Sequence, residues 1–491
     1  MRYRNLDLEA FGYKKEDTLE RFSVRVAHSP AGEQRLADAE AVALSPGLRS
    51  RLRRLEQRKL TLSEMIELGE SLAVLFPPRA RSLLDRSRAS LDDDEGLRIR
   101  LKLDTYALAD IPWEYIYLPG PDTPANTRGP DGFLVLDRRV SLARYEVQGQ
   151  SPGTLDPVGK DTLRLVVLLA NPIESGYPSL RLDLEQRNIE QALTGVNEIR
   201  AEFFSDATAD TLQDALVRPA HIFHFAGHGE FSGDPGMALG SLEGEGSLIL
   251  LDDNKRAAPF SAKKLALNLM GRGVRLAVLG ACEGGRRDQV NPWTGVVPAL
   301  TRAGIPAVVG MQYTIQDQNA IAFSRRFYRA LAAGESIDGA VTDGRLSILN
   351  RSSDDERDWG VPVLYLRAEE GTLFPKAAGG SSSPAVPPQP ERRSAPAPQS
   401  VSAATPPDAN VDPRALRNAM VNAFGVEDLE VLCTDVQSDL KDAGIDLLVS
   451  LEIVGGNGLT MKVLNLIQYL DRRGYLGYLV TAVRRARPGI I

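Results

Sequence analysis

The chain has 491 residues, 43% of them hydrophobic, and its formal net charge at pH 7 is −7. This length predicts two to four domains, and without a basic excess a nucleic-acid partner is not expected. Two cysteines are too few for a secreted disulfide scaffold, and paired Cys-x-x-Cys motifs for zinc are absent from the sequence.

The sequence also argues against a membrane protein. Residues 1–17 hold no apolar run of the kind that marks a signal peptide. No stretch of about 18 apolar residues occurs, and the basic residues are spread along the chain, so neither a membrane span nor a membrane-surface patch is expected. The low cysteine count favours a reducing compartment. We therefore expect a soluble, cytoplasmic protein.

Residues 1–155 predict a mixed α/β portion. Segments 22–26, 97–103 and 133–145 alternate apolar with charged residues, which predicts strands with one face in water. The segment 111–120, IPWEYIYLPG, carries one Trp and two Tyr beside prolines. We expect these aromatic side chains to form a plug in the core.

The strands change character in residues 156–370, the expected core. The predicted strands here are near-continuous apolar runs, typical of strands buried on both faces of a parallel sheet: 163–170, 221–227, 274–281 and 307–311. Predicted helices alternate with them: 183–195, 209–217, 294–304 and 317–333. This order predicts an α/β fold, a doubly wound sheet with helices on both faces. Whether the first 155 residues continue the same sheet is left open by the sequence.

Residues 371–411 are dominated by Pro, Ser, Ala and Gly and nearly lack large apolar residues. Such a segment cannot bury enough surface to offset its ordering entropy, which predicts a disordered linker. The alternative is a proline-rich ligand for a recognition domain.

Residues 412–491 predict a small all-α domain of four to six short helices. Apolar residues recur at helical spacing in this segment: Leu416, Met420, Phe424, Leu429, Leu432, Val463, Leu464, Ile467, Leu476, Leu479 and Val483. Residues 447–455 could form a strand or a helix. Cys433 lies among apolar residues of a predicted helix, so we expect it in the core. The charges of this domain alternate in sign, which would suit pairing with a copy of itself or a related module.

Two chemically distinctive residues follow two of the apolar strands. Three of the four histidines lie in HIFHFAGHG, and the strand is expected to end just before His228 and Gly229. In VRLAVLGACEGG the strand is expected to end just before Cys282. Open parallel sheets bind ligands beyond the carboxyl ends of their strands. If the two strands are neighbours, about 5 Å apart, the His228 imidazole and the Cys282 sulfur can approach each other.

This pairing predicts nucleophilic catalysis. The thiolate is the nucleophile of a cysteine, and a nearby imidazole can accept its proton and later deliver that proton to the leaving amine. The backbone N–H groups of Cys282 and Gly229 are the candidate oxyanion donors. No cofactor is expected. The alternative is a zinc site that uses His221, His224, His228 and Cys282, but alternation along a strand does not bring the three histidines to one face.

At these residues the sequence resembles the CHAT family, the bacterial branch of the caspase-like and separase-like cysteine peptidases. The resemblance rests on HFAGHG and LAVLGACEGG, and further on IPWEYIY, FLVLDRRVSLARY, AGIPAVVGMQYTI and FYRAL. It covers about residues 90–368. It implies a caspase-hemoglobinase fold, endopeptidase activity and catalytic roles for His228 and Cys282.

The motif around the cysteine departs from that of caspases. The chain has Ala-Cys-Glu-Gly at 281–284 and lacks the Gln that precedes this motif in caspases. The motifs do not assign the pocket for the residue before the scissile bond. Gln312 and Asp317, after the strand at 307–311, are candidate pocket residues.

The C-terminal segment resembles the effector-associated, death-like helical domains of bacterial conflict systems. LRNAMVNAFGVEDLEVLC and VLNLIQYLDRRGYLGYLVTAVRRARP carry the resemblance, and residues 446–458 depart from it. The resemblance implies contacts between like modules that recruit the peptidase to a defence or cell-death complex.

Three functions fit these features. The first is a cysteine endopeptidase that cleaves a protein partner, is recruited through its helical module, and oligomerises on activation as the linker raises the local concentration. The second is a catalytically silent scaffold or adaptor that keeps the fold. The third is a metal-bound or thiol-dependent hydrolase of small molecules.

Overall fold

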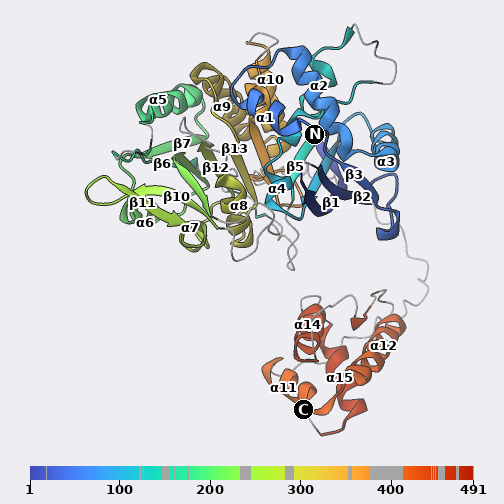
Figure 1. The fold of residues 1–491 in the computed structure, drawn as a ribbon. Coiled ribbons are helices and arrows are strands. Elements are labelled where there is room, and N and C mark those ends of the chain that lie inside the picture. Colours follow the sequence, from blue (N-terminus) through green and yellow to red (C-terminus); the bar gives the residue numbers. More distant parts are fainter. Residues whose placement is uncertain are drawn as a thin grey trace, which may run out of the picture. The chain divides into compact units, whose positions relative to one another are not determined.

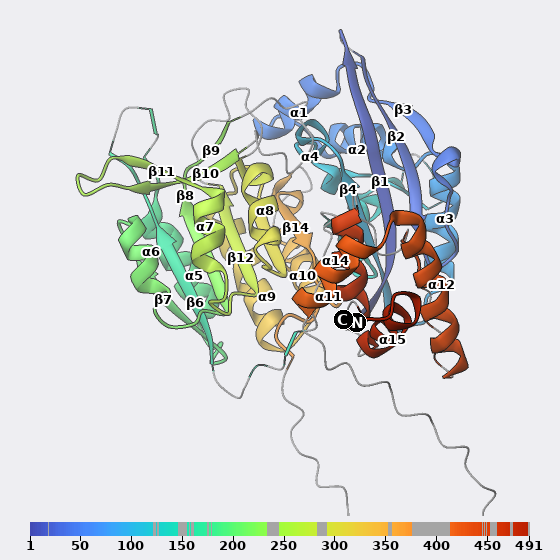
Figure 2. The same cartoon turned by 90° about the horizontal axis from the view of Figure 1, so that it is seen from below.

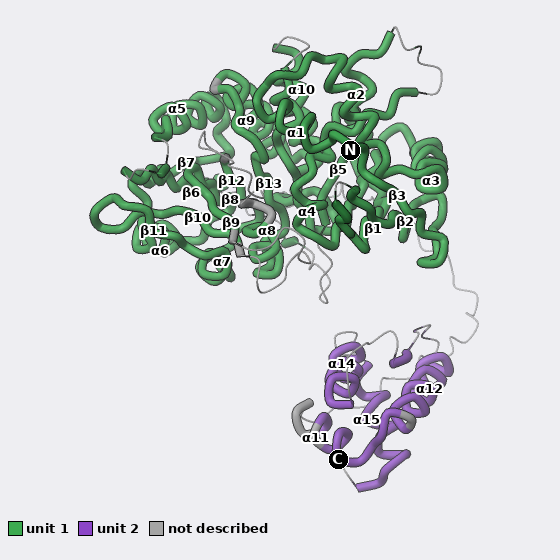
Figure 3. The backbone as a smooth tube through the Cα atoms, viewed as in Figure 1, with its two compact units in different colours: residues 1–381 green, residues 382–491 purple. Residues whose placement is uncertain are grey.

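The computed structural model divides the chain into two compact units, residues 1–381 and 382–491 (Figure 3). The structure describes residues 1–17, 19–120, 124, 127–145, 155–156, 158, 162–173, 176–177, 179–232, 245–281, 292–351, 356–375, 413–443, 445, 447, 449–451, 459–471 and 475–489. Most of the predicted linker, from residue 376 to residue 411, therefore lies outside the described residues.

The first unit is built on an 11-stranded sheet with the strand order β3-β2-β1-β4-β5-β14-β13-β12-β8-β6-β7 (Figure 1). A second sheet has the order β11-β10-β9. The strands are β1 Arg2–Glu16, β2 Leu19–His28, β3 Glu40–Ala43, β4 Glu95–Leu103, β5 Val140–Arg144, β6 Leu163–Leu169, β7 Ile199–Phe204, β8 Ile222–Gly227, β9 Gly229–Ser232, β10 Glu245–Leu251, β11 Ala257–Ser261, β12 Leu276–Ala281, β13 Ala307–Met311 and β14 Pro362–Leu366.

One continuous sheet joins the first 155 residues to the rest of the unit. Strands β7, β6, β8, β12 and β13 run parallel to one another, and β14 lies antiparallel to β13. On its other side β14 pairs in parallel with β5, which is parallel to β4 and β1. The sheet is therefore mixed and mainly parallel, as the fold class predicts.

Helices cover both faces of the sheet. Figure 1 shows α5, α9 and α10 on one side of the β6–β13 half, and α6, α7 and α8 on the other. The helices of this unit are α1 Leu48–Glu56, α2 Leu62–Leu72, α3 Pro78–Ala89, α4 Tyr106–Ala109, α5 Leu182–Leu193, α6 Ala209–Ala215, α7 Ala262–Leu269, α8 Pro292–Arg302, α9 Asp317–Ala332 and α10 Ile337–Leu349. The four helices predicted in the core correspond to α5, α6, α8 and α9.

Local capping explains where several helices begin. Thr61 caps α2 in a reciprocal capping box with Glu64, and the Thr208 and Ser336 hydroxyls accept backbone N–H groups at the starts of α6 and α10. Proline stands at the first position of α3, where its fixed φ suits a helix start. These residues give each helix a defined first turn.

The strand predicted at 133–145 is wrong in its first half. Residues Leu134–Leu136 form a short 3-10 helix, and only Val140–Arg144 form a strand. The side chain of Asp137 accepts the N–H of Arg139 at 2.8 Å, and its carbonyl accepts the N–H of Val140 at 2.9 Å. The aspartate thereby builds a local turn, which interrupts the extended backbone.

The predicted wet face holds for β2 but not for β4 and β5. Figure 2 shows β1 and β2 with α2 and α3 beside them, and buried residues alternate with more exposed ones along β2. Strand β5 is buried throughout, and β4 nearly so. Its charged residue Arg98 is 2% exposed because Asp338 of α10 covers it. The aromatic plug is confirmed, since Trp113, Tyr115 and Tyr117 are almost fully buried.

The second unit has its own apolar core. Its described helices are α11 Pro413–Ala423, α12 Val426–Asp442, α14 Leu459–Asp471 and α15 Leu476–Ala486. Nearly all of the predicted apolar positions are buried, and Leu464 is intermediate. Residues 452–458, which belong to the segment 446–458 that departs from the resemblance, lie outside the described residues.

Candidate functional site

Strands β8 and β12 are parallel neighbours in the centre of the large sheet. Their pairing ends with Ala281 opposite Gly227. His228 follows Gly227 directly in the sequence, and Cys282 follows Ala281. Cys282 itself belongs to 282–291, which lies outside the described residues.

His228 is fixed between the two sheets. Its backbone carbonyl accepts the N–H of Ile249 in β10 at 2.9 Å. Its side chain is buried, with 6% of the residue exposed, and its ring centroid lies 5.2 Å from that of Tyr177 at an interplanar angle of 54°. The imidazole therefore occupies a packed position beyond the end of β8.

Gly229, the predicted oxyanion donor, opens β9 and pairs with Leu248 of β10. The adjacent bond from Ile249 N–H to the His228 carbonyl makes Gly229 and Leu248 a non-hydrogen-bonded pair of the antiparallel ladder. In such a pair the N–H of Gly229 points away from β10. This direction is compatible with a donor role, whereas the other expected donor, Cys282, is not described.

The other strand histidines have structural partners. His221 Nδ1 accepts the backbone N–H of Arg164 at 2.9 Å. His224 faces the opposite side of β8, where its Nδ1 lies 3.2 Å from the Tyr328 hydroxyl of α9 and its Nε2 3.6 Å from Glu185 of α5. Burial lowers the pKa of His224 to about 4. Within the described part of the chain, no three His, Cys, Asp or Glu side chains form a metal-binding group.

Gln312, a candidate pocket residue, has hydrogen-bond partners in the interior. Gln312 is buried, with 5% exposed, and its Nε2 donates to Glu114 at 3.2 Å and to the Gly360 carbonyl at 3.4 Å. These partners hold its amide in the interior, and its pocket role stays a prediction. Asp317 begins α9, and its side chain is not described.

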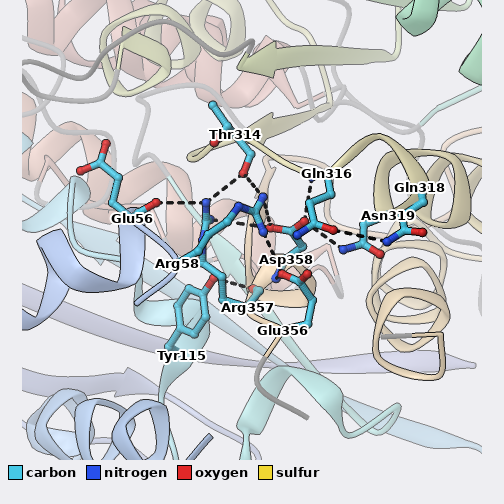
Figure 4. A network of polar contacts seen from close by, with 10 residues as sticks. All are labelled: Glu56, Arg58, Tyr115, Thr314, Gln316, Gln318, Asn319, Glu356, Arg357 and Asp358. Carbon is cyan, nitrogen blue, oxygen red and sulfur yellow. Dashed lines mark hydrogen bonds and ion pairs between the residues drawn. The ribbon is translucent and has the colours of Figure 1, made fainter. Parts of the chain in front are cut away.

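A polar network holds the loop that follows β13 at the same sheet edge (Figure 4). Arg58 and Arg357 both donate to the Thr314 carbonyl, each at 3.0 Å. Asp358 accepts the Gln316 N–H at 2.8 Å and the Asn319 amide at 3.0 Å, and Arg58 lies 2.7 Å from its other oxygen. The network connects the α1–α2 loop to the short 3-10 helix before β14 and thereby fixes the loop that follows β13, the neighbour of β12.

Sequence reasoning missed Tyr177, whose ring contacts that of His228, and two side chains that hold the surrounding segments. Tyr177 covers the imidazole, Glu230 accepts its hydroxyl, and Asn171 bonds to the backbone of Leu180. The only available signal was the position of Asn171 directly after an apolar strand run, which resembles the placement of His228 and Cys282.

Cys433, the other cysteine, is 2% exposed in the core of the second unit. Burial raises the pKa of its thiol to about 11, so little thiolate forms at neutral pH. Among the described helices, none combines the length and the apolar character that crossing a bilayer requires.

Comparison with solved structures gives distant matches. The Arg-specific cysteine proteinase gingipain R (RgpB of Porphyromonas gingivalis) is 12% identical, with 62% of this chain and 70% of that chain covered and a TM-score of 0.36. A chain of the Saccharomyces cerevisiae separase–securin complex is 14% identical, with 68% of this chain and 21% of that chain covered and a TM-score of 0.30. Chaetomium thermophilum Raptor is 11% identical, with 38% of this chain and 19% of that chain covered and a TM-score of 0.24.

Comparison with protein families gives a match over most of the first unit. No curated protein matches the chain. The CHAT domain family matches residues 67–369, which is more than half of the 491 residues and includes the strands that lead to His228 and Cys282. The mixed, mainly parallel sheet with helices on both faces is the fold of these caspase-like cysteine peptidases. The chain therefore belongs to the CHAT domain family.

Proposed function

We propose that the protein is a cysteine endopeptidase in which His228 and Cys282 form the catalytic pair. The observation that carries this proposal is the register of β8 and β12. It aligns Gly227 with Ala281. His228 follows Gly227 in the sequence, and Cys282 follows Ala281. Neighbouring strands lie about 4.8 Å apart, within reach of a proton transfer between these two side chains.

In this mechanism the His228 imidazole accepts the proton of the Cys282 thiol. The thiolate attacks the scissile carbonyl carbon, and the backbone N–H groups of Gly229 and Cys282 stabilise the oxyanion. The imidazolium then donates its proton to the leaving amine as the C–N bond breaks. Water, deprotonated by the same imidazole, hydrolyses the thioester and regenerates the thiol.

The second unit supports a recruitment role. Its helices enclose a separate apolar core, so it can associate without disturbing the catalytic sheet. We propose that contacts between such modules, in a bacterial defence or cell-death-like pathway in the cytoplasm, bring peptidase units together and toward a protein substrate. Tethering through the predicted linker, residues 371–411, would raise the effective concentration of the catalytic units.

The test compares cleavage of a proteome by the full chain, with and without induced dimerisation of the C-terminus. New peptide N-termini are identified by mass spectrometry for wild type, Cys282→Ala and His228→Ala. We expect a loss of more than about 100-fold for both variants. Cys433→Ala, the matched cysteine control, should retain cleavage.

The outcomes separate the alternative functions. Cleavage that persists in Cys282→Ala would exclude the proposed mechanism, and its loss with a chelator would favour a metal-dependent hydrolase. A folded wild-type chain that cleaves nothing in either state would favour the silent scaffold.

A further inference from the structure

We propose that Tyr177 is a positioning residue for the His228 imidazole and that Glu230 holds it in place. The inference rests on the proposed peptidase function and adds a third side chain to the pair. Cysteine and serine hydrolases generally need a group that orients the base. Tyr177 is a described side chain whose ring lies against this imidazole.

The contact between the two rings restricts the imidazole. Their centroids are 5.2 Å apart and their planes are tilted by 54°, within the range in which aromatic rings attract each other. His228 retains only 6% of its exposure. A flip or large rotation of the imidazole would have to displace the tyrosine ring, so the ring holds the nitrogens in one orientation.

Tyr177 is in turn anchored to the strand that follows His228. Its hydroxyl donates to the Glu230 carboxylate at 2.5 Å. Glu230 lies in β9, two residues after His228, and pairs with Ser247 of β10. A hydrogen bond to an ionised acceptor is among the stronger kinds. The tyrosine and the histidine are thereby fixed to the same short segment of backbone.

Hydrogen bonds also join the residues before and after Tyr177, Asn171 and Leu180. Asn171, which follows β6 and alanine 170, donates to the Leu180 carbonyl and accepts the Leu180 N–H, both at 3.1 Å. Gly176, next to Tyr177, has φ of +124°, a conformation that favours glycine. Described residues on both sides of Tyr177 are thereby held to each other through Asn171 and Leu180.

Orientation of the base affects the chemical step rather than substrate binding. A misplacement of about 1 Å in a catalytic group can lower the rate about 100-fold. Loss of the tyrosine ring should therefore lower kcat and leave KM nearly unchanged. Loss of the hydroxyl alone should have a smaller effect, because the ring remains.

The kinetic test compares Tyr177→Ala, Tyr177→Phe and Glu230→Gln in the full chain, on a peptide identified by the proteome assay. We expect kcat to fall about 10- to 100-fold for Tyr177→Ala and less for the other two, with KM within about twofold. Tyr13→Ala is the matched control, because Tyr13 also donates to a carboxylate, Glu20, at 2.9 Å but lies in β1. It should leave kcat unchanged.

A second readout does not depend on peptidase activity. Diethyl pyrocarbonate modifies accessible histidines, and peptide mass spectrometry resolves each site. His28 is exposed and His224 is 4% exposed, so they serve as internal references for fast and slow modification. We expect Tyr177→Ala to speed modification of His228 several-fold without changing either reference.

Two results would overturn the positioning role. One is a rise in kcat for Tyr177→Ala, which would make the ring an obstruction; the other is an unchanged rate of His228 modification. If wild type shows no cleavage that depends on Cys282, the proposed function fails and the catalytic role of Tyr177 fails with it. The histidine modification would still decide whether the ring covers the imidazole.

Discussion

The two halves of the large sheet bury polar groups in different ways. In the β4–β5 half, charged side chains are buried as pairs. Arg98 and Asp338 have side chains that are 2% and 0% exposed, and Arg144 and Glu114 have side chains that are 4% and 0% exposed. Each guanidinium makes two bonds to one carboxylate and further bonds to backbone carbonyls. These partners offset the large desolvation penalty of the charges.

The described residues of strands β6, β8, β12 and β13 bury almost only apolar side chains, and their polar exception, His224, is neutral. His224 lies between β8 and helices α5 and α9, and its Nε2 has no hydrogen-bond partner among the described residues. Burial lowers its pKa to about 4 because the charged form would be desolvated. A charge on His224 would lack the two hydrogen bonds to one carboxylate that Arg98 and Arg144 each make, so the histidine stays uncharged at neutral pH.

The largest expected effect comes from breaking a pair in the charged half. Arg144→Met leaves Glu114 buried without its cation, which should lower the free energy of unfolding by about 3–5 kcal/mol. All three tryptophans, at 113, 293 and 359, lie in the first unit. Tryptophan fluorescence during denaturant unfolding of the full chain therefore measures this unit alone. Arg144→Met with Glu114→Gln should recover part of the loss; a single variant with the wild-type midpoint would contradict the account.

The next effect concerns pH and the apolar half. The folded pKa of His224, about 4, lies below its unfolded value of 6.5. The unfolded chain binds the extra proton between these values, so this contribution to stability is present above pH 6.5 and is lost as pH falls to 4. The loss amounts to about 3 kcal/mol.

The measurement for this effect is the free energy of unfolding at several pH values. His224→Asn should show a shallower decline between pH 6.5 and 4 than wild type, whereas His28→Asn, at an exposed position, should follow wild type. Parallel curves for His224→Asn and wild type would show that His224 does not titrate as its burial predicts.

The smallest effect is expected at the surface. Lys255 and Asp206 form an ion pair at 2.7 Å with side chains that are 57% and 58% exposed. Lys255→Met should change the free energy of unfolding by less than about 1 kcal/mol, again by tryptophan fluorescence. A loss as large as that of Arg144→Met would mean that burial does not decide the strength of these pairs.

The same difference explains which strands the sequence could predict. β6, β8, β12 and β13 appear as apolar runs, because both of their faces are covered by apolar side chains. The sequences of β4 and β5 indicate strands with one solvent-exposed face, because their charged residues have ion-pair partners far along the chain. Arg98 and Asp338 are 240 residues apart. No local pattern carries that pairing, and α1, α2 and α3 were missed in the same region.

The candidate site divides in a similar way. The position of His228 could be predicted, since it needs only the end of an apolar strand and the topology of a parallel sheet. Tyr177 could not, because its contact with His228 joins residues from different loops and its neighbours have no periodicity. The interior partner of Gln312 could not be predicted for the same reason, because Glu114 lies 198 residues away.

The pairing of His228 with Cys282 can be tested most directly through the reactivity of the two cysteines. The rate of iodoacetamide alkylation of each cysteine is measured by peptide mass spectrometry in wild type and His228→Ala, from pH 5 to pH 9. We expect Cys282 to react readily at neutral pH in wild type and much more slowly in His228→Ala, because the imidazole no longer accepts the thiol proton. Cys433 should stay unreactive in both, since burial raises its pKa to about 11. Identical pH dependence of Cys282 alkylation in the two proteins would contradict the pairing.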